Sequence, residues 1–259
     1  MTEKRENYSD NEHSILYAET GGACPLCTLP ILLKKPGSKK PIKGYELAHI
    51  YPLNPTPAQV KALTDHPAPA AINDLENILA LCPTCHRKYD KDFKIEELIK
   101  LKNIKKDFLS EANAKLTASQ HTIQLEVCEI LDIITEFDFG DTELTTINFD
   151  VTTVDKKLKK GMSPLQKREI KLNAVSFYVR IRDHIRFLEQ QDQASVKILQ
   201  NQINSYYLAM QKQNPENKDL VFNYVAQWIS AKTNKPILAS KVLTSFFVQN
   251  CEVFDVGPN

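Results

Sequence analysis

Two Cys-x-x-Cys pairs constrain the fold of this chain more than any other feature of its sequence. The first pair is Cys24 and Cys27, and the second is Cys82 and Cys85. A Cys-x-x-Cys turn presents two thiolates from one knuckle, and zinc prefers four such ligands in a tetrahedron. The interval between the pairs is longer than the roughly 15 to 20 residues of simple zinc ribbons. The pattern therefore predicts a closed structural Zn²⁺ site that joins the two ends of a compact inserted module.

Two disulfides or a thioredoxin-like redox pair are the alternatives for these cysteines. Residues 1–7 are polar and no apolar stretch follows them, so we predict no secretory signal and expect a reducing, cytoplasmic environment. The remaining cysteines, Cys128 and Cys251, are single and far apart, as buried apolar thiols usually are. These features favour zinc over both alternatives.

Two short strands are predicted between the cysteine pairs. Residues 44–52 indicate a strand that closes at a proline, with His49 near its end. After a loop, Asn77 begins the apolar run 78–81, which would return as the second strand. The loop between the strands would thus be bounded by one histidine and one asparagine.

A helix is predicted directly after the second strand. It begins near Pro83, and Thr84 is its expected cap. His86 and Asp90 are four residues apart on this helix, so their side chains lie on one face and could share a cation. Two strands followed by a helix with metal-ligating side chains make a ββα-metal arrangement.

Residues from about 21 to 92 resemble an HNH endonuclease of the four-cysteine type. The resemblance rests on His49 in Ala-His-Ile-x-Pro, on Asn77 five residues before the second cysteine pair, and on His86 immediately after the last cysteine. It implies that His49 is the general base that takes a proton from water, and that Asn77 fixes the loop and the His49 ring. It also implies that His86, with Asp90, holds a divalent cation beside the phosphodiester.

The residue types suit this chemistry. Neutral imidazole has an unperturbed pKa close to neutral pH, which favours proton abstraction. One His and one Asp leave ligand positions for water and phosphate oxygens, so Mg²⁺ or Mn²⁺ is expected there. Many HNH nucleases carry an acidic residue or a second His directly before the general base, where this chain has Ala48. Glu46 would lie on the same face of the strand and could substitute.

Basic residues near the predicted site are the candidates for contact with nucleic acid. A lysine-rich stretch, 34–43, surrounds a Pro-Gly turn just before the His49 strand. As a hairpin tip it could neutralise DNA phosphates, and otherwise it is a solvated edge. The formal net charge of +1 excludes a general nucleic-acid coat. The candidate nucleic-acid contacts are Lys39, Lys40, Lys43, Arg87 and Lys88.

Beyond residue 92 the pattern is helical and carries no further chemistry that we identify. Apolar residues recur at helical spacing over 93–108 and again over about 112–137. A Gly-containing turn follows at 138–141, and Ser163 then caps the first of about four further helices. We therefore predict three segments: an HNH nuclease module with structural zinc at 14–95, linking helices at 96–140, and a helical partner-binding or regulatory domain at 141–259.

The last segment resembles a C-terminal domain of bacterial ABC-three-component defence proteins. The resemblance rests on residues 147–157 and on the phenylalanine-rich stretch 245–254. It implies an effector subunit that assembles with an ABC-type ATPase and a small middle component, and whose cleavage activity is triggered during phage infection. No Gly-x-x-x-x-Gly-Lys-Ser/Thr loop occurs in this chain, so the ATPase would be a separate protein.

The sequence as a whole predicts an α+β protein, with a small zinc-stapled ββα-metal module followed by a mainly α-helical C-terminal domain. Its composition, 42% hydrophobic and 25% charged, is typical of soluble globular proteins. We expect an endonuclease that hydrolyses DNA, with no membrane partner and with the oligomeric state left open. The alternatives are a stand-alone modification-dependent restriction nuclease, a toxin acting on RNA, and a non-catalytic zinc-stapled module that binds nucleic acid or protein.

Overall fold

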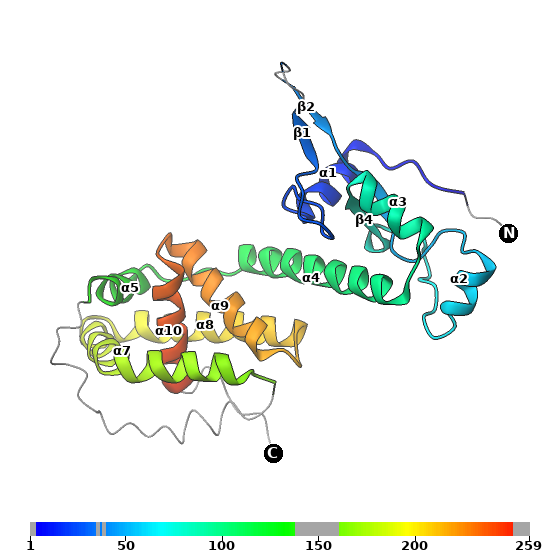
Figure 1. Cartoon of the computed structure of the whole chain (residues 1–259). Helices are drawn as coiled ribbons and strands as arrows, with labels where there is room; N and C mark the ends of the chain where they lie inside the picture. The colour runs from blue at the N-terminus through cyan, green and yellow to red at the C-terminus, as the bar shows by residue number, and fades with distance from the viewer. Residues whose placement is uncertain (1–3, 35–36, 38–39, 138–160, 251–259) are drawn as a thin grey trace. The chain divides into compact units, whose positions relative to one another are not determined.

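The computed structural model describes residues 4–34, 37, 40–137 and 161–250 (Figure 1). The chain divides into two compact units, residues 1–112 and 113–259. The predicted α+β class is confirmed, because a small unit with β-strands and the four cysteines precedes a largely helical one. In these ranges no helix is both long and apolar enough to cross a membrane. The predicted turn at 138–141, residues 147–157 and residues 251–254 lie outside the described part of the chain.

The N-terminal unit places two small antiparallel sheets among helices. Strands β1 and β2 form a ribbon that projects from the unit (Figure 1), and β3 pairs with β4 so that His49 lies opposite Ile78. The predicted order of strand, loop, strand and helix is confirmed. The elements are α1 (Asp10–Glu19), β1 (Leu32–Lys34), β2 (Pro41–Lys43), β3 (Glu46–His49), α2 (Pro57–Ala62), the 3₁₀ helix η1 (Leu75–Asn77), β4 (Ile78–Leu81), α3 (Pro83–Lys91) and α4 (Ile95–Gln120). The boundary between the two units falls within α4, after residue 112.

The core of this unit is built on β4, whose four apolar side chains are all fully buried. Leu16 of α1, Tyr89 of α3 and Leu98 of α4 pack in the same cluster. Full burial of a side chain of this kind stabilises the fold by about 1.5–3 kcal/mol. Strand β3 contacts both β4 and α3, so this packing fixes the strand that ends at His49.

Helix α3 begins two residues earlier than a Thr84 cap requires, so that expectation was wrong. Cys82 is the N-cap, and its sulfur accepts a hydrogen bond from the Cys85 backbone N–H at 3.4 Å. Pro83 occupies the first helical position, where its fixed φ suits the helix and its missing N–H costs nothing. The thiol therefore takes the place that a hydroxyl cap would otherwise occupy.

The two helices expected at 93–108 and 112–137 are divided differently in the structure. Helix α4 runs without a break to Gln120, and α5 (Glu126–Glu136) follows after a short connection. No Gly or Pro lies at 109–111 to interrupt α4. The break falls instead where the Gln124 backbone N–H donates to the Gln202 side chain at 2.8 Å. A tertiary hydrogen bond thus accompanies a boundary that local periodicity could not locate.

The C-terminal unit is a helical bundle in which α10 packs against α7, α9 and α5. Its core contains Trp228 and Tyr206, whose rings stack with centroids 4.4 Å apart, together with Phe222 and Phe246. The predicted helix start at Ser163 is confirmed, since its side chain accepts from the Gln166 N–H. The helices after α5 are α7 (Pro164–Gln191), α8 (Gln193–Gln213), α9 (Lys218–Thr233) and α10 (Ile237–Asn250).

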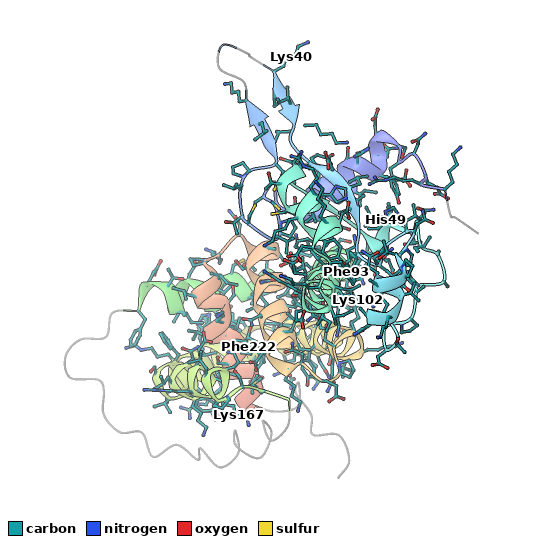
Figure 2. The ribbon with its side chains drawn as sticks, turned by 45° about the vertical axis from the view of Figure 1, so that its right-hand side comes forward. Lys40, His49, Phe93, Lys102, Lys167 and Phe222 are labelled. Atoms are coloured by element: carbon teal, nitrogen blue, oxygen red, sulfur yellow. The ribbon has the colours of Figure 1, made fainter. Side chains whose placement is uncertain are left out.

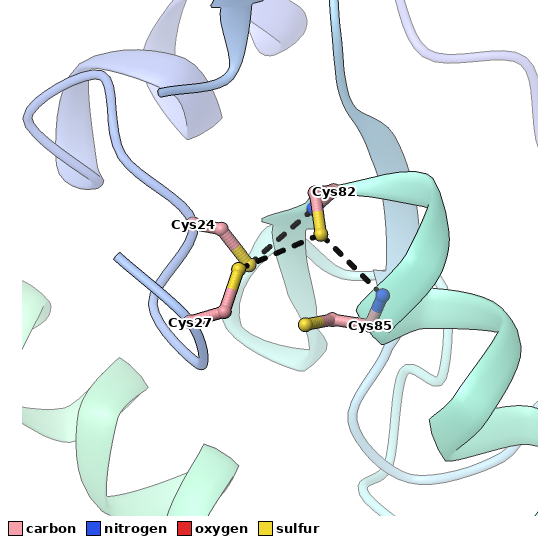
Figure 3. A group of neighbouring side chains, drawn as sticks. All are labelled: Cys24, Cys27, Cys82 and Cys85. Carbon is pink, nitrogen blue, oxygen red and sulfur yellow. Dashed lines mark hydrogen bonds between the residues drawn. The ribbon is translucent and has the colours of Figure 1, made fainter. Parts of the chain in front are cut away.

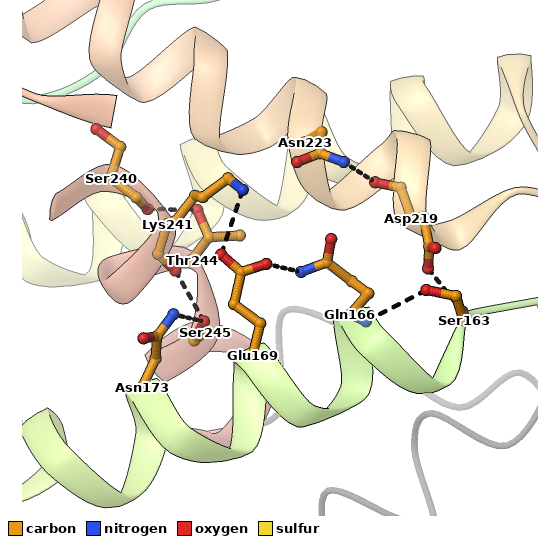
Figure 4. Close-up of polar contacts among 10 residues, drawn as sticks. All are labelled: Ser163, Gln166, Glu169, Asn173, Asp219, Asn223, Ser240, Lys241, Thr244 and Ser245. Atoms are coloured by element: carbon orange, nitrogen blue, oxygen red, sulfur yellow. Dashed lines mark hydrogen bonds and ion pairs between the residues drawn. The ribbon is translucent and has the colours of Figure 1, made fainter. Parts of the chain in front are cut away.

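A polar network links α7 to α10 and α9 within this bundle (Figure 4). Lys241 of α10 pairs with Glu169 of α7 at 3.2 Å, and Gln166 donates to the same Glu169 at 2.8 Å. Asn173 donates to the buried Ser245 hydroxyl at 3.2 Å. Such directional contacts fix the register of helices whose apolar packing alone tolerates sliding.

Candidate functional site

The four cysteine sulfurs gather into one cluster, as the sequence predicted (Figure 3). All four Sγ atoms lie within 4.8 Å of one another. Cys24 and Cys27 come from the loop after α1, whereas Cys82 caps α3 and Cys85 lies in its first turn. Cys27 Sγ and Cys82 Sγ are 3.7 Å apart, well beyond the about 2.05 Å of a disulfide. The four free thiols form a donor set that could bind zinc.

Burial and backbone N–H groups shift the pKa values of the thiols in this cluster in opposite directions. Burial opposes ionisation of Cys24, but N–H donors from Cys82, Cys27 and Leu26 lower the pKa of its thiol to about 7. The Cys82 N–H donates to Cys24 Sγ at 3.4 Å. Burial raises the pKa of the neighbouring Cys85 thiol. Since metal ligands must be thiolates, these N–H groups favour the form of Cys24 that binds metal.

His49 lies at the end of β3 and is 9% exposed. Its Nε2 atom is 2.9 Å from Oδ1 of Asn73, in the loop before η1. Burial lowers the pKa of His49 below its ordinary value, Arg5 and His86 lower it further, and Asn73 and Asp90 raise it. A lowered pKa favours the neutral imidazole, which is the form that can accept a proton.

Asn77 connects the loop after β3 to the segment before β4. Its Oδ1 accepts from the Tyr51 N–H at 2.8 Å, and its Nδ2 donates to the carbonyls of Tyr51 and Ile72 at 3.2 and 2.9 Å. Its backbone carbonyl accepts from the Ile50 N–H at 2.8 Å. Asn77 thus fixes the backbone directly after His49.

The buried His86 ring on α3 has a carboxylate at each nitrogen. Nδ1 is 2.8 Å from Oε2 of Glu46, and Nε2 is 3.2 Å from Oδ2 of Asp90. Both carboxylates reach solvent, with side-chain exposures of 49% and 60%. Ala48, at the position where many HNH nucleases carry an acidic residue or a second His, is buried among the core residues. Glu46, two residues earlier on β3, places its carboxylate against the His86 ring.

The predicted basic residues are dispersed. Lys43 Nζ is 3.2 Å from His13 Nδ1 and lies 4.8 Å from the centroid of the Tyr45 ring, so it contacts α1 and its own strand end. Figure 2 shows Lys40 near the end of the ribbon, apart from His49. Arg87 and Lys88 are exposed on α3, and Lys39 lies outside the described residues. Among the described basic residues, Lys40 and Lys43 belong to the ribbon, whereas Arg87 and Lys88 directly follow His86 on α3.

Sequence reasoning missed two residues that contact or act on this site. Asn73 has no motif around it, and only its place four residues before Asn77 could have drawn attention. Arg5 lies in a polar segment at the start of the chain, where no motif indicates a role in the site. The structure shows that an arginine N–H of Arg5 donates to the Leu47 carbonyl of β3.

Two family models match this chain. Residues 24–92 match the HNH endonuclease model. Residues 114–254 match the model of C-terminal domain 11 of the ABC-three component (ABC-3C) systems. No curated protein matches the chain. Both resemblances inferred from the sequence are confirmed, and the first match includes the cysteines and both site histidines.

Proposed function

Because the chain belongs to the family of C-terminal domain 11 of the ABC-three component systems and carries an HNH endonuclease domain, we propose that it is the metal-dependent DNA endonuclease of an anti-phage defence system. The main support is that neutral His49 at the end of β3 and the His86–Asp90 pair on α3 lie within one ββα module. Phosphodiester hydrolysis needs a base beside a cation, and this module offers both kinds of donor.

In the proposed reaction a ring nitrogen of His49 takes a proton from water. The water oxygen attacks the phosphorus, and the bond from phosphorus to the leaving sugar oxygen breaks. Asn77 holds the backbone after His49 through the Tyr51 peptide, so the imidazole keeps its place while it takes and releases the proton. The His49 pKa, lowered chiefly by burial, keeps the base unprotonated when water binds.

The donors around His86 fit a hard divalent cation such as Mg²⁺ or Mn²⁺. A metal-ligating histidine usually gives its other ring N–H to a carboxylate, which fixes the tautomer. We assign that orienting role to Glu46 at Nδ1, and leave Nε2 with Asp90 to hold the cation. Asp90 is also the carboxylate whose charge acts on His49. The cation, when bound, would neutralise charge on the scissile phosphate and the leaving oxygen.

Glu46→Gln and Asp90→Asn form a matched pair, since each removes one charge beside one nitrogen of the same ring. Asp90→Asn is expected to raise the Mn²⁺ concentration for half-maximal cleavage by about 10-fold or more, because it removes a ligand. Glu46→Gln should raise it less. Manganese titrations of plasmid cleavage measure both effects. A larger effect of Glu46→Gln would place the cation on the Nδ1 side of His86.

Cleavage is expected to increase with pH up to a plateau, because only neutral His49 accepts a proton. Burial lowers the pKa of this group, so the acid limb should lie below pH 6.5, the ordinary value for histidine. Initial cleavage rates from pH 4.5 to 8 at saturating Mg²⁺ would locate that limb. An acid limb above pH 6.5 would contradict a buried neutral base.

The four-cysteine cluster is proposed to hold structural zinc, with Cys24, Cys27, Cys82 and Cys85 as its ligands. The ABC-3C family assignment supports an ABC-type ATPase and a small third component as partners.

Supercoiled plasmid with Mg²⁺, Mn²⁺ or EDTA tests the activity, first with this chain alone and then with the ATPase added. We expect nicking or linearisation with either metal and none with EDTA, whereas cleavage of RNA alone would favour the toxin alternative.

A further inference from the structure

Residues 4–8, which we call the N-terminal arm, contact Asn73 beside the imidazole of His49. The Lys4 carbonyl accepts a hydrogen bond from Asn73 Nδ2 at 3.3 Å. The Tyr8 hydroxyl donates to the Asn73 backbone carbonyl at 3.1 Å. Arg5 donates to the Leu47 carbonyl on β3. The arm thus contacts both the strand that carries His49 and the residue bonded to its ring.

These contacts determine which way the Asn73 amide faces. A backbone carbonyl can only accept a hydrogen bond, so the group that faces Lys4 must be the NH₂ of Asn73. The carbonyl oxygen of the side chain then faces His49 Nε2, at 2.9 Å. That oxygen is also only an acceptor, so Nε2 must carry the proton. The remaining ring nitrogen, Nδ1, is left with its lone pair free to accept one.

We propose that Asn73 is a positioning residue that holds His49 in the Nε2–H tautomer and presents Nδ1 as the basic atom, and that the N-terminal arm fixes Asn73 for this task. The inference rests on the proposed function for its catalytic meaning, because His49 is the base there. No motif or family match assigns a role to Asn73 or to the arm. In the opposite tautomer Nδ1 would carry hydrogen and could not take a proton from water.

Tyr8 is the anchor of the arm. Its ring packs against the core cluster of the N-terminal unit, while its hydroxyl reaches Asn73. Asn73 is therefore held at its backbone by Tyr8, at its amide nitrogen by Lys4 and at its amide oxygen by His49. Three fixed contacts leave the side chain little freedom to rotate and release the ring.

The test uses the full chain with ¹⁵N-labelled histidine and NMR shifts that distinguish the two tautomers, alongside cleavage kinetics. Wild type is expected to show His49 as Nε2–H at pH 7.5. Asn73→Ala should remove that preference and lower kcat by about 100-fold with KM little changed, since the base is misplaced but DNA contacts remain. The matched control is Asn103→Ala, which changes an exposed asparagine on α4. It should change neither the His49 tautomer nor the cleavage kinetics.

Asn73→Asp distinguishes positioning from simple structural support. Its carboxylate still accepts a hydrogen bond from the His49 Nε2–H. Asn73→Asp should therefore keep the Nε2–H tautomer and most of the wild-type cleavage rate, both of which Asn73→Ala is expected to lose. It also adds a negative charge beside a ring already influenced by Arg5, His86 and Asp90, so the acid limb should move to higher pH than in wild type. Tyr8→Phe should give an intermediate loss, because it loosens Asn73 without removing it.

Two results would overturn the inference. One is a wild-type His49 that is Nδ1–H, and the other is an Asn73→Ala protein that keeps the Nε2–H tautomer. The tautomer measurement does not depend on activity. If no variant cuts DNA but Asn73→Ala still changes the tautomer, the proposed function fails while the orienting contact stands.

Discussion

His49→Ala is expected to lower DNA cleavage by about 100-fold or more while the fold and the bound zinc remain. The loss follows from removing the general base, whose contribution is typically of this size. The cavity left by the ring lies at the end of β3, outside the fully buried β4 residues, so the core should survive. Plasmid cleavage at low salt with Mg²⁺ and with Mn²⁺ measures the change.

The matched control for this variant is His66→Ala, which removes a histidine from the loop after α2 in the same unit. It should cut like wild type. Cleavage by His49→Ala at the wild-type rate would show that His49 is not the base. If wild type itself fails to cut, even with the ATPase components added, the non-catalytic binding module becomes the better description.

Cys24→Ser is expected to release zinc and unfold the N-terminal unit. Structural zinc contributes binding free energy on the order of 10 kcal/mol in small zinc modules, which exceeds what a small core can replace. Cys24 is itself 1% exposed and accepts the Cys82 N–H, so the substitution disturbs the loop and the start of α3 together. The C-terminal unit, which has its own core, should stay folded.

The chain allows the two units to be monitored separately. Trp228 is its single tryptophan and lies in the C-terminal core, so its fluorescence reports that unit alone. Metal analysis and far-ultraviolet circular dichroism report the zinc and the lost N-terminal structure. Cys128→Ser changes a cysteine outside the cluster and should keep one zinc per chain. Native dichroism with full zinc content in Cys24→Ser would exclude the four-thiolate site.

Much of the small module could be predicted because its signals are local. The apolar run of β4, the spacing of His86 and Asp90 on one helical face, and the paired cysteines are all short-range patterns. Such patterns depend on strand and helix periods or on the preference of zinc for thiolates. These local patterns predicted the order of the strands and the helix, and they predicted that the four cysteines lie together.

The remaining features depend on contacts between residues distant in the sequence. Asn73 and His49 are in contact although they are 24 residues apart in the sequence. The residues of the N-terminal arm that contact Asn73 are more than 60 residues from it in the sequence. The pairing of Glu46 with His86 spans 40 positions, although the strand face of Glu46 was foreseen. The boundary between α4 and α5 likewise coincides with a contact to Gln202. The periodicity of the sequence carries no information about these long-range contacts.

Cys82 connects the four-cysteine cluster to the start of the helix that carries His86. Its sulfur belongs to the four-thiol group and also accepts the hydrogen bond that begins α3, four residues before His86. If the proposed zinc and cation sites are both filled in the active protein, a newly synthesised chain without zinc would lack a fixed His86 and could not hold the catalytic cation. Maturation would follow an order, zinc first and magnesium or manganese second, and a strong chelator should inactivate the protein in a way that magnesium alone does not reverse.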